Sequence, residues 1–184
     1  MQLIQRAQAD DREAFASLFE QYKNLVFKTA YLMFGNRDEA EDALQEVFIL
    51  VHKSLSGFDP RKGAFSTWLH RITVNYCLNQ HRKRHALMVS LEDVSTVFAN
   101  EFPGERLDEK EAIEQALSRL SDRQKAVVIL RYYWALPYSE ISAILDIPLG
   151  TVKSRLDLAL KTMRKILGEQ DFNPGLAPEV KVDV

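Results

Sequence analysis

Several features that define common classes of protein are scarce or missing in this sequence. Cys77 is the only cysteine among 184 residues, so no disulfide can form within the chain and a cysteine-rich zinc site is excluded. No apolar run approaches the roughly 18–20 residues that a membrane span needs. The first residues, Met1 to Arg6, lack the apolar core of a signal peptide. We therefore expect a cytoplasmic protein with no membrane insertion of its own.

The sequence also lacks the motifs by which most enzymes are recognised. It contains no Gly-rich phosphate loop, no nucleophile elbow and no cluster of metal ligands, so we expect neither an enzyme nor a bound cofactor. His81 and His85 stand four residues apart, a spacing that can bind a metal, but no third ligand is evident. Because both histidines adjoin cationic residues, contact with phosphate is the better interpretation.

Charge is unevenly distributed along the chain, although the formal net charge is only −2. Residues 86–118 hold 8 acidic and 2 basic residues, whereas residues 1–85 and 119–184 are mildly basic. Basic ends that flank an acidic middle suit a chain whose ends approach a polyanion. An ordinary charged linker between ordinary surfaces would give the same pattern, and charge alone does not separate the two interpretations.

Apolar residues recur at helical spacing through most of the sequence, which predicts an all-α fold. We expect a helix from Asp10 or Asp11 to about Phe34, ended by Gly35, and a second helix over about 38–56. Gly57, Pro60 and Gly63 mark a loop, and a third helix follows over about 66–84. Residues 1–85 would form one small helical domain.

The periodicity is lost over residues 86–107, which are predicted to be a flexible acidic linker. The second domain is expected over 108–167, with residues 168–184 as a frayed tail. Within it, Ser121 and Gln124 form a capping-box pattern, Pro137 opens a short helix, and a last helix runs over about 150–167. The prediction is two small helical domains joined by a flexible linker.

A short helix, a tight turn and a longer helix in the second domain match the helix-turn-helix pattern. Ile141, Ile144 and Leu145 would pack against Val152 and Leu156. The residues left exposed near the start of the second helix are Thr151, Lys153, Ser154 and Arg155, and Lys161 continues the positive charge. In this motif such residues contact base edges and phosphates, although a plain helical hairpin would show the same spacing.

The residues of this motif, Tyr138 to Ile141 followed by Ile147 to Leu156, closely resemble region 4 of extracytoplasmic-function sigma factors. The resemblance implies that Thr151, Lys153, Ser154, Arg155 and Lys161 bind the −35 element of a promoter. One departure follows Leu156, where the family usually carries basic residues and this chain has Asp157, Leu158, Ala159 and Leu160. Fewer phosphate contacts would weaken DNA binding, or the two leucines would meet a protein surface.

Glu41 to Phe48 resembles region 2.2 of the same family, which implies docking on the β′ coiled coil of RNA polymerase through Asp42, Gln45, Glu46 and Phe48.

Phe65 to Ile72 and the residues after it resemble regions 2.3 and 2.4. That resemblance implies binding of the unpaired −10 element by Phe65, Ser66, Trp68, Arg71, Asn75, Asn79, Arg82, Lys83 and Arg84, with loop 57–64 forming a base pocket. For Phe65 and Trp68 a role in the core is the favoured alternative, and Asn79 stands where many members carry Asp.

These motifs occur in the family's order and cover most of residues 10–167. They predict a sigma factor that binds core RNA polymerase (β′ coiled coil and β flap) and promoter DNA, with an anti-sigma factor as a further partner. The main alternative is a stand-alone helix-turn-helix regulator that binds a duplex by itself. A helical adaptor that makes no DNA contact is a third possibility.

Overall fold

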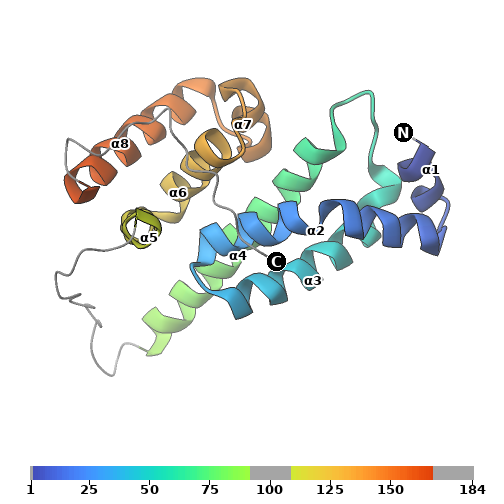
Figure 1. The fold of residues 1–184 in the computed structure, drawn as a ribbon, viewed down its shortest axis with the longest axis horizontal. Coiled ribbons are helices and arrows are strands. Elements are labelled where there is room, and N and C mark those ends of the chain that lie inside the picture. Colours follow the sequence, from blue (N-terminus) through green and yellow to red (C-terminus); the bar gives the residue numbers. More distant parts are fainter. Residues whose placement is uncertain (1, 92–108, 168–184) are drawn as a thin grey trace.

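The computed structural model describes residues 2–91 and 109–167, and every regular element in these two ranges is a helix (Figure 1). The predicted all-α class is therefore confirmed. Most of the predicted linker and the whole predicted tail lie outside the described residues. Among the helices that are described, none combines the length and the hydropathy needed to cross a lipid bilayer.

The first unit contains four α-helices whose ends follow from local capping. They are α1 (Gln2–Gln8), α2 (Arg12–Phe34), α3 (Arg37–Ser54) and α4 (Phe65–Leu91), with a short 3₁₀ turn, η1 (Leu55–Gly57), after α3. The Asp11 side chain accepts a hydrogen bond from the Ala14 N–H at 3.0 Å and so caps α2. Gly35 ends this helix in the left-handed conformation (φ 70°), where glycine carries no steric penalty.

The core of the first unit forms where α2, α3 and α4 turn their apolar faces toward one another. Val26, Val47 and Leu69, one from each helix, are completely buried. Around them lies an aromatic cluster in which Phe58 and Phe65 are buried with 5.3 Å between their ring centroids. This packing fixes α4 and the loop before it, which together carry the predicted −10 residues.

The second unit contains α5 (Glu109–Ser118), α6 (Asp122–Val128), a π-helical turn η2 (Ile129–Tyr133), α7 (Tyr138–Leu145) and α8 (Leu149–Leu167). The predicted cap before α6 is present, because the Ser121 N–H donates to Gln124 Oε1 at 3.1 Å. Pro137 precedes α7 as expected. Asp146 ends α7 in the left-handed conformation (φ 53°), which turns the chain into α8.

The two units pack directly on each other, an arrangement that the sequence did not predict. α4 contacts both α6 and α7, and α2 contacts α6 and η2. Figure 1 shows the second unit lying along one side of α2 and α4. One continuous apolar core joins Met33, Val74 and Cys77 of the first unit to Ala126 and Leu130 of the second.

One helix was not predicted, and two others end at residues that differ from the prediction. α1 was not expected, α3 ends at Ser54 and gives way to η1, and α4 continues to Leu91 instead of ending near Arg84. The longer α4 has a simple cause, since no glycine or proline occurs between Phe65 and Leu91 to stop the helix. The first part of the predicted linker is therefore helical.

Truncation of Leu69 should test the core of the first unit. Leu69 is 0% exposed, so Leu69→Ala should lower the free energy of unfolding by about 2–5 kcal/mol, because it removes buried contacts and leaves a cavity. Leu87→Ala is the matched control, since Leu87 is 63% exposed on the same helix. Urea denaturation followed by circular dichroism measures both, and equal losses in the two variants would contradict this core.

Candidate functional site

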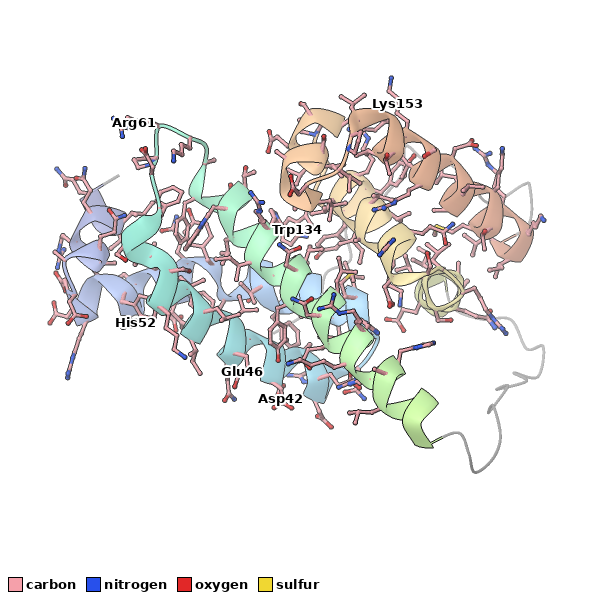
Figure 2. All side chains as sticks on the ribbon, turned by 180° about the vertical axis from the view of Figure 1, so that it is seen from behind. Asp42, Glu46, His52, Arg61, Trp134 and Lys153 are labelled. Atoms are coloured by element: carbon pink, nitrogen blue, oxygen red, sulfur yellow. The ribbon has the colours of Figure 1, made fainter. Side chains whose placement is uncertain are left out.

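An acidic surface covers the outer side of α3. Asp42, Gln45 and Glu46 are all exposed, and Figure 2 shows Asp42 and Glu46 projecting from the edge of the molecule. Two apolar residues that sequence reasoning missed, Ile49 and Leu50, continue this surface with 44% and 40% exposure. Exposed acidic and apolar groups side by side are typical of a protein-binding surface.

The structure places Phe48, another predicted polymerase contact, in the core. Its side chain is buried, and its ring centroid lies 4.7 Å from that of Phe19 and 6.3 Å from that of Phe15. Phe48 therefore holds α3 against α2. The exposed surface consists of Asp42, Gln45 and Glu46 with Ile49 and Leu50, and we call these five residues the α3 surface.

A cavity of about 230 Å³ lies at the start of α4. Its walls come from the loop before α4, from Thr67, Trp68 and Arg71 of α4, and from Ala143 and Ile144 of α7. Within the loop, the Arg61 guanidinium binds the Asp59 carboxylate at 2.9 Å and lowers the pKa of that carboxyl. The loop that the resemblance assigns to a base pocket therefore does line a cavity, together with a helix of the second unit.

The predicted −10 residues divide into buried and exposed groups. Phe65 is buried, Ser66 and Trp68 are half-buried, and the Trp68 ring packs against Phe58 and Phe65 at 5.3 and 5.4 Å between centroids. The exposed residues are Arg71, Asn75, Asn79, Arg82, Lys83 and Arg84. Because Arg71, Asn75 and Asn79 recur every four residues, they form one stripe along α4 that leads from the cavity to the basic end of the helix. We call this exposed set the α4 stripe.

The basic end of α4 is partly engaged within the protein. Arg84 pairs with Glu39 of α3, and its guanidinium lies 5.6 Å from the centroid of the Phe34 ring. Arg82 Nη2 donates to Asn79 Oδ1 at 3.2 Å. His81 does not face solvent with the cations: its ring stacks on Phe34, and its Nδ1 lies 3.5 Å from Asp122 Oδ1 of the second unit. No group of three possible metal ligands occurs among residues 2–91 and 109–167.

The helix-turn-helix is built from α7 and α8. Ile141, Ile144, Val152 and Leu156 are buried together, as the spacing predicted. At the start of α8, Lys153 and Ser154 are exposed and Thr151 and Arg155 are half-buried; Lys161 is exposed further along the helix. Figure 2 shows Lys153 pointing away from the molecule on the edge opposite Asp42 and Glu46. We call these five α8 residues the α8 surface.

Neighbouring charged residues alter the positive charge that the α8 surface presents. Lys161 Nζ lies 2.8 Å from Asp157 Oδ2, so the unusual acidic residue neutralises part of the basic face. Burial, together with the positive charge of Arg123, lowers the pKa of Arg155. Arg123, at the start of α6, is therefore a neighbouring cation that sequence reasoning missed, because only the fold brings the two arginines close.

The contact between the two units depends on residues that the sequence analysis did not single out. Trp134 Nε1 donates a hydrogen bond to Thr29 Oγ1 of α2 at 3.0 Å, and Figure 2 shows Trp134 beside α4. Lys125, which is buried, donates from Nζ to the Met33 carbonyl at 3.1 Å. Carbonyl groups in the last turn of a helix lack partners within the helix and attract a cation, so Lys125 completes the end of α2.

His70 of α4 is buried beneath Trp134. The centroids of the two rings are 4.9 Å apart, and His70 Nδ1 has no hydrogen-bond partner among the described residues. Burial lowers the pKa of His70 to about 4, because the imidazolium cation would lose its hydration there. His70 is therefore neutral at pH 7 in this arrangement.

Taken together, these features are typical of a DNA-binding protein. The second unit carries a helix-turn-helix with an exposed basic helix start, and the first unit presents a polar, basic helix beside a cavity. Comparisons with known proteins give the family. Residues 18–86 match Sigma-70 region 2, and residues 110–163 match Sigma-70, region 4. The chain belongs to the extracytoplasmic-function sigma factors of the sigma-70 family, which act in transcription initiation.

Two curated relatives and one solved structure illustrate the similarity. The chain is 32% identical to the ECF RNA polymerase sigma factor SigW of Bacillus subtilis, over 89% of this chain and 94% of that protein. It is 34% identical to SigE of Mycolicibacterium smegmatis, over 83% of this chain and 61% of that longer protein. The sigma factor RpoE of Bartonella quintana, solved with the anti-sigma factor NepR, has the same fold, with a TM-score of 0.69 and 24% identity over 86% of this chain and 98% of that chain.

His70 makes the stability of the protein depend on pH in a defined direction. Because the pKa is lowered to about 4 in the folded protein, the unfolded chain binds a proton more readily, and stability falls as the pH drops from about 6.5 toward 4. Between pH 7 and pH 5 the protonation of this group should lower the free energy of unfolding by on the order of 2 kcal/mol. Urea denaturation at the two pH values should show a smaller loss for His70→Leu than for the wild type. His52→Leu, at an exposed histidine, should keep the wild-type loss.

Proposed function

We propose that the chain binds core RNA polymerase through the α3 surface, directs it to promoters and helps to open them. In this proposal the α8 surface reads the −35 element, and the α4 stripe with the neighbouring cavity binds the unpaired −10 strand. The cytoplasm is the proposed location, and the proposed role is that of a transcription regulator and not of an enzyme. The proposed units are those predicted over residues 1–85 and 108–167, with the first extended to Leu91 by the longer α4.

The observation that carries the proposal is the presence of three separate surfaces on one chain. An acidic and apolar α3 surface suits a basic protein partner, whereas a polar and basic α4 stripe beside a cavity suits a nucleic-acid strand with an extruded base. The exposed start of α8 suits the major groove. A stand-alone regulator is not favoured, because the chain matches Sigma-70 region 2 as well as Sigma-70, region 4.

Exposed apolar residues on α8 extend the proposal to a further polymerase contact. Leu158 and Ile166 are 55% and 37% exposed, and Leu158 stands where a basic residue would serve DNA. We assign this side of α8 to a protein partner, for which the β flap of polymerase is the candidate. An anti-sigma factor is a further proposed partner, since the similar structure of RpoE contains one.

Run-off transcription tests the proposed function directly. Core RNA polymerase is assayed with and without the protein on genomic promoter fragments from the source organism. Specific initiation only when the protein is present supports the proposal and identifies promoters for later use. No initiation, together with no binding to core polymerase in a parallel pull-down, would overturn it in favour of the stand-alone regulator.

Reversal of one charge on the α3 surface should weaken polymerase binding. We expect Asp42→Lys to raise the Kd for core polymerase roughly tenfold, because it places a cation where the proposed partner is basic. Glu20→Lys makes the same change of net charge on α2, where Glu20 pairs with its neighbour Lys23, and it should bind like the wild type. Fluorescence anisotropy of labelled protein gives both constants, and equal affinity of Asp42→Lys and the wild type would reject the docking surface.

Reversal of one charge on the α8 surface should weaken promoter binding. Arg155→Glu is expected to reduce affinity for a −35 duplex about tenfold or more, since one good contact to a base edge contributes about 1–3 kcal/mol. Arg12→Glu, at an exposed position of α2, supplies the same change of net charge outside every proposed surface. Both are measured by electrophoretic mobility shift with the polymerase holoenzyme, at one fixed salt concentration. Unchanged promoter affinity of Arg155→Glu would contradict the −35 assignment.

A further inference from the structure

The loop that lines the cavity is bound at its base by a residue far away in the sequence. Gln8, the last residue of α1, donates hydrogen bonds from Nε2 to the Leu55 carbonyl at 3.0 Å and to the Phe58 carbonyl at 2.8 Å. Because the amide nitrogen of glutamine carries two N–H groups, it can serve both acceptors at once. One side chain of α1 thus joins the beginning and the end of the turn that leads from α3 into the loop.

The other hydrogen bonds of this region are local. The Phe58 N–H donates to the Leu55 carbonyl at 3.0 Å, which closes the turn. Asp59 Oδ1 accepts from the Arg61 N–H at 3.0 Å, which shapes the loop beyond it. The bonds from Gln8 differ because they span 47 and 50 positions of sequence. They therefore fix the loop relative to the rest of the first unit.

Phe58 connects the turn to the wall of the cavity. Its ring packs against Phe65 and Trp68, with 5.3 Å between ring centroids in both pairs. Gly57, Phe58 and Trp68 all line the cavity, whereas Gln8 is not one of its lining residues. An effect of Gln8 on the cavity must therefore pass through the backbone of the loop.

The helix that carries Gln8 is held in place by other residues. Ala7 is buried, and Leu3 and Ile4 pack against the core of the first unit. Figure 1 shows α1 beside the start of α2 and the end of α3, in agreement with its contacts to α2 and η1. Loss of the Gln8 amide should therefore leave α1 docked and release only the base of the loop.

We propose that Gln8 is a positioning residue for the −10 base pocket, because its two hydrogen bonds hold loop 57–64 where the cavity accepts an extruded base. The inference rests on the proposed function, which assigns this cavity to the unpaired −10 strand. Binding groups must be held within about 0.5 Å of their productive geometry, so loss of a support outside the site is enough to weaken binding. Gln8 contributes to promoter opening through the loop and without contact with DNA.

Three variants test this role. Gln8→Met removes the N–H donors and keeps a side chain of similar length. Gln5→Met makes the same replacement at an exposed position of the same helix and is the matched control. Gln8→Glu keeps the shape of the side chain and places a carboxylate against two carbonyl oxygens, so its effects should be at least as large as those of Gln8→Met. Urea denaturation followed by circular dichroism establishes that each variant is folded at the assay temperature.

Amide hydrogen exchange, measured by NMR on the free protein, reports the loop directly. The Phe58 N–H should exchange about fivefold faster in Gln8→Met than in the wild type, because loss of these hydrogen bonds favours local opening of the turn. Amides of α8 should keep their wild-type rates, and Gln5→Met should match the wild type throughout. Unchanged exchange of the Phe58 N–H in Gln8→Met would overturn the inference.

The pocket is tested with the polymerase holoenzyme and a labelled single strand that spans a −10 element mapped by run-off transcription. Abasic sites placed at each position in turn identify the base whose removal weakens wild-type binding most. The ratio of the affinities for the intact and the abasic strand measures the contribution of that base. Gln8→Met should lower this ratio about fivefold and change affinity for the abasic strand less than about twofold. An equal loss for both strands would indicate a general structural role and would overturn the inference.

The outcomes separate failure of the inference from failure of the proposed function. Absence of run-off transcription by the wild type would overturn the proposed function, and amide exchange would still show whether Gln8 holds the loop. Normal transcription, with an unchanged ratio in Gln8→Met, would overturn the inference alone. An equal fall of the ratio in Gln5→Met would overturn it as well, because a change on the surface of α1 would then explain the effect.

Discussion

A lysine of α6, buried against the last turn of α2, constrains how the two units of this protein pack together. An ammonium group removed from water needs hydrogen-bond acceptors, and Lys125 finds one in the Met33 carbonyl at 3.1 Å. The surrounding contact is apolar, with Leu130 and Val74 in one continuous core. Burial lowers the pKa of Lys125, because the charged ammonium group loses hydration there. The carbonyl groups at the end of α2 offset part of this cost, since they attract a cation.

The position of this contact decides which surfaces the protein presents. With α6 and η2 seated on α2, α7 falls beside α4 and the start of α8 faces away from the first unit. The α3 surface lies on yet another side. A partner that engages two of these surfaces at once gains from their connection within one chain.

The ion pair between Arg71 and Asp146 across the contact is weak. Arg71 and Asp146 are both largely exposed at a separation of 3.9 Å, and exposed pairs of this kind contribute only about 0–1 kcal/mol. The apolar core between the units supplies most of the free energy that holds them together.

The sequence by itself determined most of the helices, caps at Asp10 or Asp11, at Gly35 and at Ser121, the interior of the helix-turn-helix and the family, because periodicity, capping and motifs are local signals. It did not reveal α1 or the length of α4, and the family resemblance placed the buried Phe48 on the polymerase-binding surface. Only the tertiary structure decided that Trp134 meets Thr29 and that α7 faces the α4 stripe. The Trp134 contact spans 105 positions of sequence, and no local pattern encodes which of several compatible apolar faces pack together.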